Sequence, residues 1–239
     1  MCKPTAFALL LALAAACTAP GALREARSEI EPPPADGRLQ VGFLIVDGVY
    51  NSELMAPWDI FHHTVFHTSP GMRVFTVAPS LDPVRSFEDL RILPDYTYDT
   101  APPIDVLVVP SAEHSMDSDL EDEAMMRFVR KRGAEADYLV SLCDGAFVLA
   151  AAGLLEGRWA TTFPSDIPRF REMFPDVRVR EDLSFVHDGR AITSAGGALS
   201  YDAALYLVEE LYGEAVARGV AGGLVIDWST DRVAHYRAE

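Results

Sequence analysis

The chain has 239 residues, which is enough for one sizeable α/β domain but too few for two. It carries 36 acidic and 20 basic side chains, a formal net charge of −16, and no dense Lys/Arg run offsets this charge. Such a surface repels phosphate backbones, so the composition argues against a nucleic-acid partner.

The first residues have the pattern of an export signal. Lys3 precedes an apolar run at 6–16, which is about as long as a signal-peptide core and too short to span a bilayer. Small residues stand directly before Cys17, which resembles the lipobox of bacterial lipoproteins. We therefore expect a signal peptide at 1–16, a lipid on Cys17, and an exported, periplasmic protein whose membrane contact is this anchor. A secretory peptide cleaved nearby is the alternative.

The expected processing of the N-terminus decides where the flexible tether lies and which cysteines remain in the folded domain. Residues 17–38 show no periodic pattern and contain prolines at 32–34, which is typical of a flexible linker. Cys2 would leave with the signal and Cys17 would carry lipid, so the folded part keeps Cys143 alone. A lone thiol forms no internal disulfide, so it is either a buried passenger or a working thiol.

Strands and helices alternate along the first half of the domain. The apolar run at 41–46 predicts a strand covered on both faces, and 52–66 predicts a helix. A strand at 72–78 follows, and two short strand-like pieces lie at 84–87 and 90–93.

The second half continues this alternation. A buried strand is expected at 104–109 and a helix at 119–132, where acidic residues begin the helix and basic residues end it. Gly133 is a plausible C-terminal cap of that helix. A strand at 138–142 runs into a helix of small residues at 145–152.

The last elements are a hairpin and two helices. Strands at 185–186 and 191–193 flank a turn signal that includes His187, and helices are expected at 200–212 and 214–224.

This order of elements predicts the fold class. Repeated strand–helix alternation with buried strands indicates an α/β fold with a doubly wound, mostly parallel sheet sandwiched by helices, as in flavodoxin-like proteins. The domain is expected to span 39–226, and 227–239 to form a C-terminal tail.

Cys143 is the sharpest chemical signal. Ligands of an open parallel sheet bind beyond the carboxyl ends of its strands, where 47–53, 110–114 and 143–145 bring polar groups together. An apolar strand runs directly into Cys143 and then into a helix, which predicts a tight turn with the thiol at a helix N-terminus. The N–H groups there favour the thiolate, lower its pKa and can hold a developing anion. A small buried core cysteine is the alternative.

Four stretches of sequence together resemble the ThiJ/PfpI superfamily. They are FLIVDGVYNSELMAPWDIF, VLVVPSAEH, YLVSLCDGAFVLAAAGLLEGRWATTF and ITSAGGALSYDAALYLVEELYG, in the family's order. The resemblance runs from 41 to 224 and implies the class I glutamine amidotransferase-like fold. The last two stretches are most similar to the branch that contains isonitrile hydratases and the amidase-like domains of certain transcription regulators.

The resemblance implies roles for particular residues. It makes Cys143 the nucleophile, and it places Glu53 where the family has a carboxyl group near the sulfur. It assigns the backbone N–H groups of Ala112 and Asp144 to an anion hole, and it implies a homodimer without a cofactor. A carboxyl group within reach of a thiol can orient it and shuttle a proton. A solvated residue in the first turn of a helix is the alternative for Glu53.

Two departures from the family pattern bear on the activity. Family proteases often carry His directly after the nucleophile and the isonitrile hydratase branch typically carries Thr, whereas this chain has Asp144. A carboxylate there opposes thiolate formation unless it turns away to cap the helix, which argues against a peptidase. Ser111 and Ala112 replace the usual glycine pair, which narrows the backbone freedom of the anion hole.

Other polar residues are candidates for the site. His114 follows the predicted anion-hole loop and is a candidate acid or base for Cys143, with a surface histidine as the alternative. Thr162, Ser194 and Gly196 are candidates to line the pocket, as similar segments do in the family, or they are turn residues.

No metal site is expected. Of the histidines at 62, 63 and 67 only the last two share a helix face, and no acidic third ligand is evident. A solvated helix end explains them better.

The sequence therefore predicts a cysteine-dependent hydrolase or hydratase that acts on a small electrophilic substrate. Amide, aldehyde and isonitrile carbons all fit this set of groups. The alternative is a non-catalytic sensor whose Cys143 is oxidised reversibly and stabilised by Glu53. A ligand-binding domain like those of regulators is less favoured, because the chain has the pattern of an exported protein and shows no DNA-binding segment.

Overall fold

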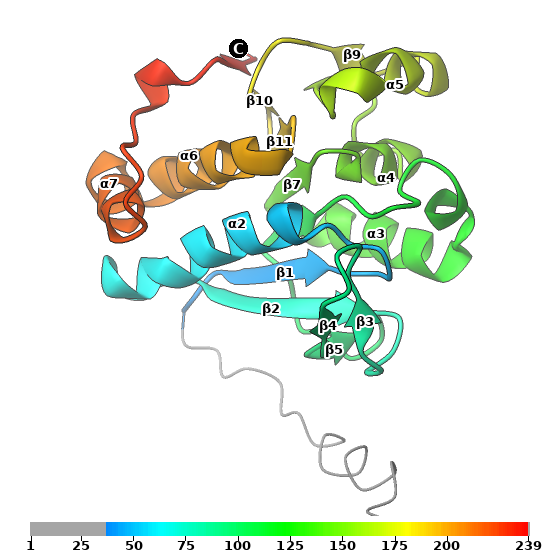
Figure 1. Cartoon of the computed structure of the whole chain (residues 1–239), viewed down its shortest axis with the longest axis horizontal. Coiled ribbons are helices and arrows are strands. Elements are labelled where there is room, and N and C mark those ends of the chain that lie inside the picture. The colour runs from blue at the N-terminus through cyan, green and yellow to red at the C-terminus, as the bar shows by residue number, and fades with distance from the viewer. Residues whose placement is uncertain (1–36, 239) are drawn as a thin grey trace, which may run out of the picture. The chain divides into compact units, whose positions relative to one another are not determined.

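The computed structural model describes residues 37–238 (Figure 1). The predicted signal peptide, Cys17 and the tether up to residue 36 lie outside the described residues. Within the described part of the chain, no helix has the length and apolar character needed to cross a membrane.

An eight-stranded sheet forms the centre of the domain. Its spatial order is β12-β10-β11-β7-β6-β1-β2-β5, and every neighbouring pair is parallel except β10 with β11. These strands span Gln40–Leu44 (β1), Arg73–Ala78 (β2), Tyr96–Thr97 (β5), Val106–Val109 (β6), Tyr138–Leu142 (β7), Phe185–Asp188 (β10), Ala191–Ser194 (β11) and His235–Arg237 (β12). The predicted mostly parallel sheet is confirmed.

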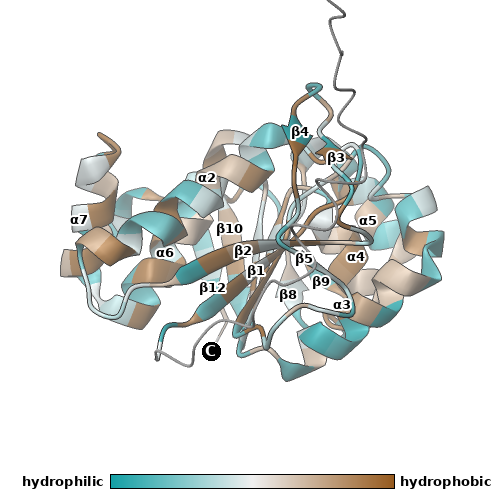
Figure 2. Cartoon of the chain, turned by 90° about the horizontal axis from the view of Figure 1, so that it is seen from below, coloured by the Kyte–Doolittle hydropathy of each residue, from teal (hydrophilic) through white to brown (hydrophobic). Residues whose placement is uncertain are grey.

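Helices cover both faces of the sheet (Figure 2). The helices α2, α6 and α7 share one apolar core with the sheet, while α3, α4 and α5 share a second. They span Asn51–His63 (α2), Glu123–Glu135 (α3), Gly145–Ala151 (α4), Ile167–Met173 (α5), Ser200–Tyr212 (α6) and Glu214–Gly223 (α7). Two small ribbons lie outside the main sheet, β3 (Val84–Arg85) with β4 (Arg91–Ile92), and β8 (Trp159–Ala160) with β9 (Arg178–Val179).

The two cores explain why the central strands are continuously apolar. In β6, Val106 and Val108 belong to the core on the α2 side, whereas Leu107 and Val109 belong to the core on the α3 side. Successive side chains of a strand point to opposite faces, so a strand buried on both faces is apolar at most of its positions. Each such side chain contributes roughly 1.5–3 kcal/mol to folding through burial.

Gly133 does not cap α3, because the helix continues to Glu135. A Cβ at Gly133 would lie 2.4 Å from Cδ1 of Leu154, which packs against the helix from beyond α4. The glycine therefore serves close packing rather than helix termination.

The C-terminal residues join the sheet rather than form a tail. Strand β12 pairs in parallel with β10, with Phe185 opposite His235. The guanidinium of Arg180 lies 3.9 Å from the ring centroid of Tyr236, which holds this edge strand against the β9 segment. A three-residue edge strand carries too little periodicity to be predicted from sequence.

His187 lies within β10 and is buried. Its Nε2 donates to the carbonyl oxygen of Gly189 at 2.9 Å, so Nδ1 accepts a hydrogen bond from the Tyr206 hydroxyl at 2.8 Å. Burial lowers the pKa of His187, so the folded protein holds this histidine neutral.

We expect His187 to make the fold less stable in acid. An unfolded chain keeps a histidine pKa of about 6.5, so below that pH it takes up a proton that the folded protein refuses. The contribution to stability is present above this pH and is lost as the pH falls, at up to about 1.4 kcal/mol per pH unit. Urea unfolding near pH 7.5 and near pH 5.5 checks it, because the difference should shrink in His187→Gln. An unchanged difference in the variant would contradict this assignment.

Candidate functional site

Cys143 stands on a strained turn between β7 and α4. Its φ of 54° lies in the left-handed region that residues other than glycine rarely adopt. The backbone N–H of Cys143 donates to the carbonyl oxygen of Ser194 at 3.0 Å, which ties the turn to β11. The predicted tight turn from strand to helix is confirmed.

Two glycines make this turn possible. A Cβ on Gly145 would lie 2.0 Å from the carbonyl oxygen of Val109, at the end of β6. A Cβ on Gly196, whose φ is 84°, would lie 2.3 Å from Cβ of Cys143. Backbone atoms therefore approach the turn closely from both sides, and this close packing fixes the position of the sulfur.

The thiol of Cys143 rests in its neutral form. The residue is 7% exposed. Burial raises the pKa of the thiol well above its usual range, and the carboxyl groups of Asp144 and Glu53 raise it further. The Ser111 hydroxyl and the Asp144 backbone N–H oppose this rise without overcoming it. The lowered pKa expected from a helix N-terminus is therefore wrong for this site.

The carboxyl group of Asp144 faces the thiol. Sγ of Cys143 donates to its Oδ2 at 3.7 Å, and the Thr162 hydroxyl donates to its Oδ1 at 2.9 Å. Asp144 makes no side-chain cap on α4. Burial raises its pKa to about 6, against the lowering effect of the Thr162 hydrogen bond. A carboxyl group that titrates near neutral pH can exchange a proton with the thiol.

Glu53 is buried, with 5% of the residue exposed, so it is not a solvated helix residue. Its Oε1 accepts a hydrogen bond from the Gly197 backbone N–H at 2.8 Å, and its Oε2 accepts one from the Ser52 hydroxyl at 2.5 Å. Because Gly196 presses on Cys143, the 196–197 loop holds Glu53 close to the turn.

Two predicted residues have other partners. The backbone N–H of Ala112 donates to Oγ of Ser115 at 2.8 Å, so it is already engaged. His114 is exposed and pairs with Asp117 at 3.4 Å, which matches the surface alternative. Of the two predicted anion-hole amides, only that of Asp144 acts on the sulfur.

Ser194 and Gly196 shape the loop rather than line a pocket. Ser194 is fully buried, and its hydroxyl lies 3.2 Å from the carbonyl oxygen of Ser184 and 3.3 Å from that of Leu199. Its Oγ also accepts a hydrogen bond from the Gly196 N–H at 3.2 Å. These bonds set the loop that contacts both Cys143 and Glu53.

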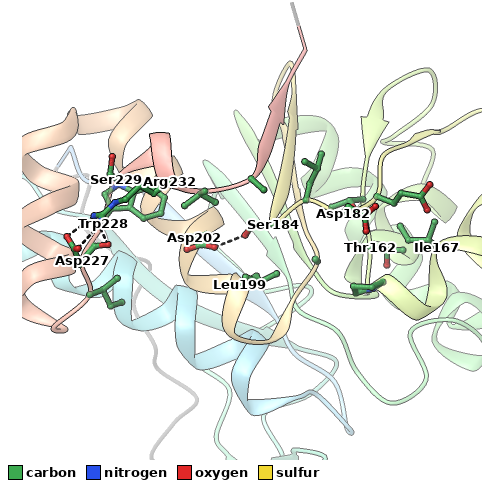
Figure 3. Close-up of a pocket in the computed structure, with 18 residues that line it drawn as sticks. Thr162, Ile167, Asp182, Ser184, Leu199, Asp202, Asp227, Trp228, Ser229 and Arg232 are labelled. Carbon is green, nitrogen blue, oxygen red and sulfur yellow. Dashed lines mark hydrogen bonds and ion pairs between the residues drawn. The ribbon is translucent and has the colours of Figure 1, made fainter.

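A groove of about 600 Å³ begins beside the turn, and Thr162 lines it (Figure 3). Figure 3 shows Asp202 near its middle, bonded to the Ser184 hydroxyl at 2.7 Å. Its charged lining consists of Glu181, Asp182, Asp202, Asp227 and Arg232. Arg232 is paired with Asp227, so the groove has an acidic character.

Sequence reasoning missed the parts that Ser111 and Tyr50 play in the site. The Tyr50 N–H donates to the Ser111 carbonyl oxygen at 3.0 Å. Burial raises the pKa of Tyr50, and the proximity of the ionisable Cys143 raises it further. The parallel pairing of strands could have pointed to Ser111. Residues that lie the same number of positions beyond the ends of two paired parallel strands are neighbours at the same edge of the sheet.

Comparison with known proteins agrees with this geometry. Residues 39–210 match the DJ-1/PfpI family. The chain is 34% identical over 178 residues to isonitrile hydratase from Pseudomonas putida, a match that covers 73% of each chain. It is 36% identical over 116 residues to the HTH-type transcriptional regulator CdhR of Pseudomonas aeruginosa, covering 48% of this chain and 34% of the regulator.

A solved structure shows the same fold. The crystal structure of a ThiJ/PfpI family protein from Pseudomonas syringae matches with a TM-score of 0.70 and 30% sequence identity, over 81% of this chain and 77% of that one. The sheet, the strained cysteine turn and these relatives lead to one assignment. The chain belongs to the DJ-1/PfpI family.

Proposed function

We propose that this protein is an isonitrile hydratase, which converts R–N≡C and water into the formamide R–NH–CHO. The observation that carries the proposal is the neutral thiol of Cys143, whose hydrogen is directed at Oδ2 of Asp144. An isonitrile accepts both a proton and a nucleophile at its terminal carbon. A protonated thiol beside a proton relay supplies both. Amide hydrolysis begins with a thiolate, which this site disfavours.

In the first step the S–H group adds across the isonitrile carbon. The thiol proton passes to Oδ2 of Asp144, and the sulfur forms a bond to the carbon. Asp144 then delivers the proton to that same carbon, which gives the thioformimidate R–N=CH–S–Cys143. Atoms and charge balance, and no oxidant is needed. With a pKa of about 6, Asp144 can hold or release a proton near neutral pH. Because the raised pKa of the thiol opposes a free thiolate, the S–C bond forms as the proton leaves.

In the second step water adds to the thioformimidate carbon. A C–O bond forms, one water proton reaches the nitrogen through Asp144, and the C=N bond becomes a single bond. The C–S bond then breaks, and the hydroxyl proton returns to the sulfur. The products are the formamide and the free thiol of Cys143, so the enzyme is ready for another cycle.

Glu53 has a different part in this proposal. Both of its oxygens already accept hydrogen bonds, from Ser52 and from the Gly197 N–H, so it is held rigidly. Its charge helps to keep the thiol protonated, and it stabilises the positive charge that develops when the isonitrile carbon gains a proton. The role of proton relay, which we expected for Glu53 as a carboxyl group within reach of the thiol, is proposed here for Asp144.

The groove beside the turn offers room for the rest of the substrate. Thr162 lines the groove and bonds to Asp144, so a substrate whose carbon lies at the sulfur extends naturally into it. The acidic lining disfavours substituents with negative charge. Neutral or cationic isonitriles are therefore the proposed substrates.

Turnover of cyclohexyl isonitrile tests the proposal. Chromatography with mass detection should show N-cyclohexylformamide forming with saturation kinetics, and in ¹⁸O water the product should carry one ¹⁸O atom. The absence of turnover, together with selective oxidation of Cys143 by peroxide, would favour the redox sensor instead. The raised pKa of the thiol argues against that sensor, because the thiolate is the form that peroxide oxidises.

Asp144 is expected to set the acid limb of the pH profile. The relay must begin as a carboxylate in order to accept the thiol proton, and burial raises the pKa of Asp144 to about 6. Turnover should therefore rise as the pH increases through about 6 and should fall below it. In Asp144→Asn, kcat should drop by about 10²–10⁴-fold and the acid limb should disappear. A variant that keeps the same limb would show that another group titrates.

A further inference from the structure

Ser111 reaches the same edge of the sheet as Cys143. In the parallel pair of β6 and β7, Val109 lies opposite Ser141, and Ser111 and Cys143 each follow two residues later. The two segments stay in contact beyond the strands, because a Cβ on Gly145 would lie 2.0 Å from the Val109 carbonyl oxygen. The end of β6 therefore lies directly against the cysteine turn.

The Ser111 hydroxyl is buried and is available to the sulfur. The residue is 0% exposed, and its Oγ has no hydrogen-bond partner among residues 37–238. An unpaired buried hydroxyl costs about 1–3 kcal/mol, so a nearby acceptor is expected. The register of β6 and β7 places Cys143 at the equivalent position of the neighbouring segment, so its sulfur is the acceptor we infer for this hydroxyl once the sulfur carries negative charge, and the Ser111 side chain lowers the pKa of the thiol accordingly.

The neighbouring backbone amide does not supply this hydrogen bond. The N–H of Ala112 donates to Oγ of Ser115, which is itself buried, at 2.8 Å. The loop is also fixed by the bonds from the Tyr50 N–H to the Ser111 carbonyl oxygen and from the Glu113 N–H to the Gly48 carbonyl oxygen, each 3.0 Å long. Ala112 is therefore held with its N–H directed away from the sulfur.

We propose that Ser111 is a catalytic residue whose hydroxyl stabilises negative charge on the sulfur of Cys143, in place of the Ala112 backbone N–H. This inference rests on the proposed function in one respect, namely the steps of the reaction at which the sulfur becomes negatively charged. In that reaction the sulfur becomes negative as its proton leaves and again as the C–S bond breaks. The hydroxyl donates a hydrogen bond and keeps its own proton, so the step transfers no atom from Ser111.

The rate of Cys143 alkylation tests this inference without any substrate. The full chain is treated with iodoacetamide over a range of pH, and the modified Cys143 peptide is quantified by mass spectrometry, which separates it from Cys2 and Cys17. In Ser111→Ala the rate at a fixed, mildly alkaline pH should fall about tenfold, because a hydrogen bond to a charged group is lost. Ser111→Thr, which keeps the hydroxyl, should react within a few-fold of the parent.

Two further variants separate this role from general loss of packing. Ser141 is also fully buried, and its hydroxyl has no hydrogen-bond partner in the described part of the chain. The pKa of the Cys143 thiol responds to Ser111 and not to Ser141, so Ser141→Ala should leave the alkylation rate unchanged. Ser115→Ala frees the Ala112 N–H. The loop bonds still direct this N–H away from the sulfur, so the alkylation rate of Ser115→Ala should stay close to that of the parent.

Equal alkylation rates in Ser111→Ala and the parent would overturn the inference, and so would an equal slowing in Ser141→Ala. If Ser111→Ala fails to fold, Ser111→Gly removes the hydroxyl without adding volume and must show the same slowing. The result is independent of the proposed reaction. If isonitriles are not turned over but Ser111→Ala still slows alkylation, the proposed function fails and this inference stands.

Discussion

Replacement of Cys143 by alanine is expected to reduce isonitrile turnover by at least about a thousandfold. The sulfur forms the bond that carries the substrate carbon through both steps, and no group in the described part of the site offers an equivalent nucleophile. Asp144 and Glu53 would remain in place, but water alone would have to attack the isonitrile. Steady-state kinetics with cyclohexyl isonitrile, followed by formamide release, measure the loss.

Cys143→Ala must keep the fold of the parent, so that a loss of turnover can be assigned to the missing thiol. Alanine is smaller than cysteine and keeps the same backbone turn, so circular dichroism and the urea midpoint should stay close to those of the parent. The variant also keeps Cys2 and Cys17, so any loss of turnover is specific to the thiol at position 143. Retained turnover in a folded variant would remove Cys143 from the reaction.

Substitution of Gly145 by alanine is expected to destabilise the protein by about 3 kcal/mol or more. The added Cβ would lie 2.0 Å from the Val109 carbonyl oxygen and 2.9 Å from the carbonyl carbon. Both contacts are with backbone, so no side-chain rotation can relieve them. Either α4 moves away from β6 or the cysteine turn opens, and the thiol then loses its place beside Asp144. Urea unfolding at equilibrium measures the change in stability.

Gly222→Ala provides the matched control. Gly222 lies in the last turn of α7, and a Cβ there has open space within 4 Å. Because alanine favours a helix over glycine, this change should be neutral or should stabilise the protein by up to about 1 kcal/mol. Equal destabilisation by the two substitutions would mean that the contact between the end of β6 and the start of α4 is not specially tight.

The architecture could be predicted because the same sequence pattern, an apolar strand followed by a helical segment, is repeated along the chain. Strands buried on both faces leave continuous apolar runs, and the run at 138–142 gave β7 with its bounds unchanged. The meeting of polar segments beyond the strand ends follows from parallel pairing alone, so the neighbourhood of Cys143 and Glu53 could be predicted. Gly133 shows the limit of such patterns, since its packing against Leu154 depends on tertiary structure.

The electrostatic character of the site was not predictable from the sequence. The start of a helix favours a thiolate, but burial and the Asp144 carboxyl outweigh it once the side chain turns toward the sulfur. The orientation of Asp144 depends on the Thr162 hydroxyl, which is 18 residues away in sequence. In the same way, the hydrogen bond from the Ala112 N–H to Ser115, which makes this N–H unavailable to the sulfur, depends on the conformation of one loop.

The central claim is that the thiol of Cys143 adds to the isonitrile carbon, and mass spectrometry of the protein quenched in acid during turnover tests it most directly. Addition without a leaving group predicts that the Cys143 peptide gains the whole mass of the isonitrile. This species should be absent from Cys143→Ser and should decay as formamide appears. Turnover with an unmodified Cys143 peptide, or with the added mass on another residue, would contradict the account.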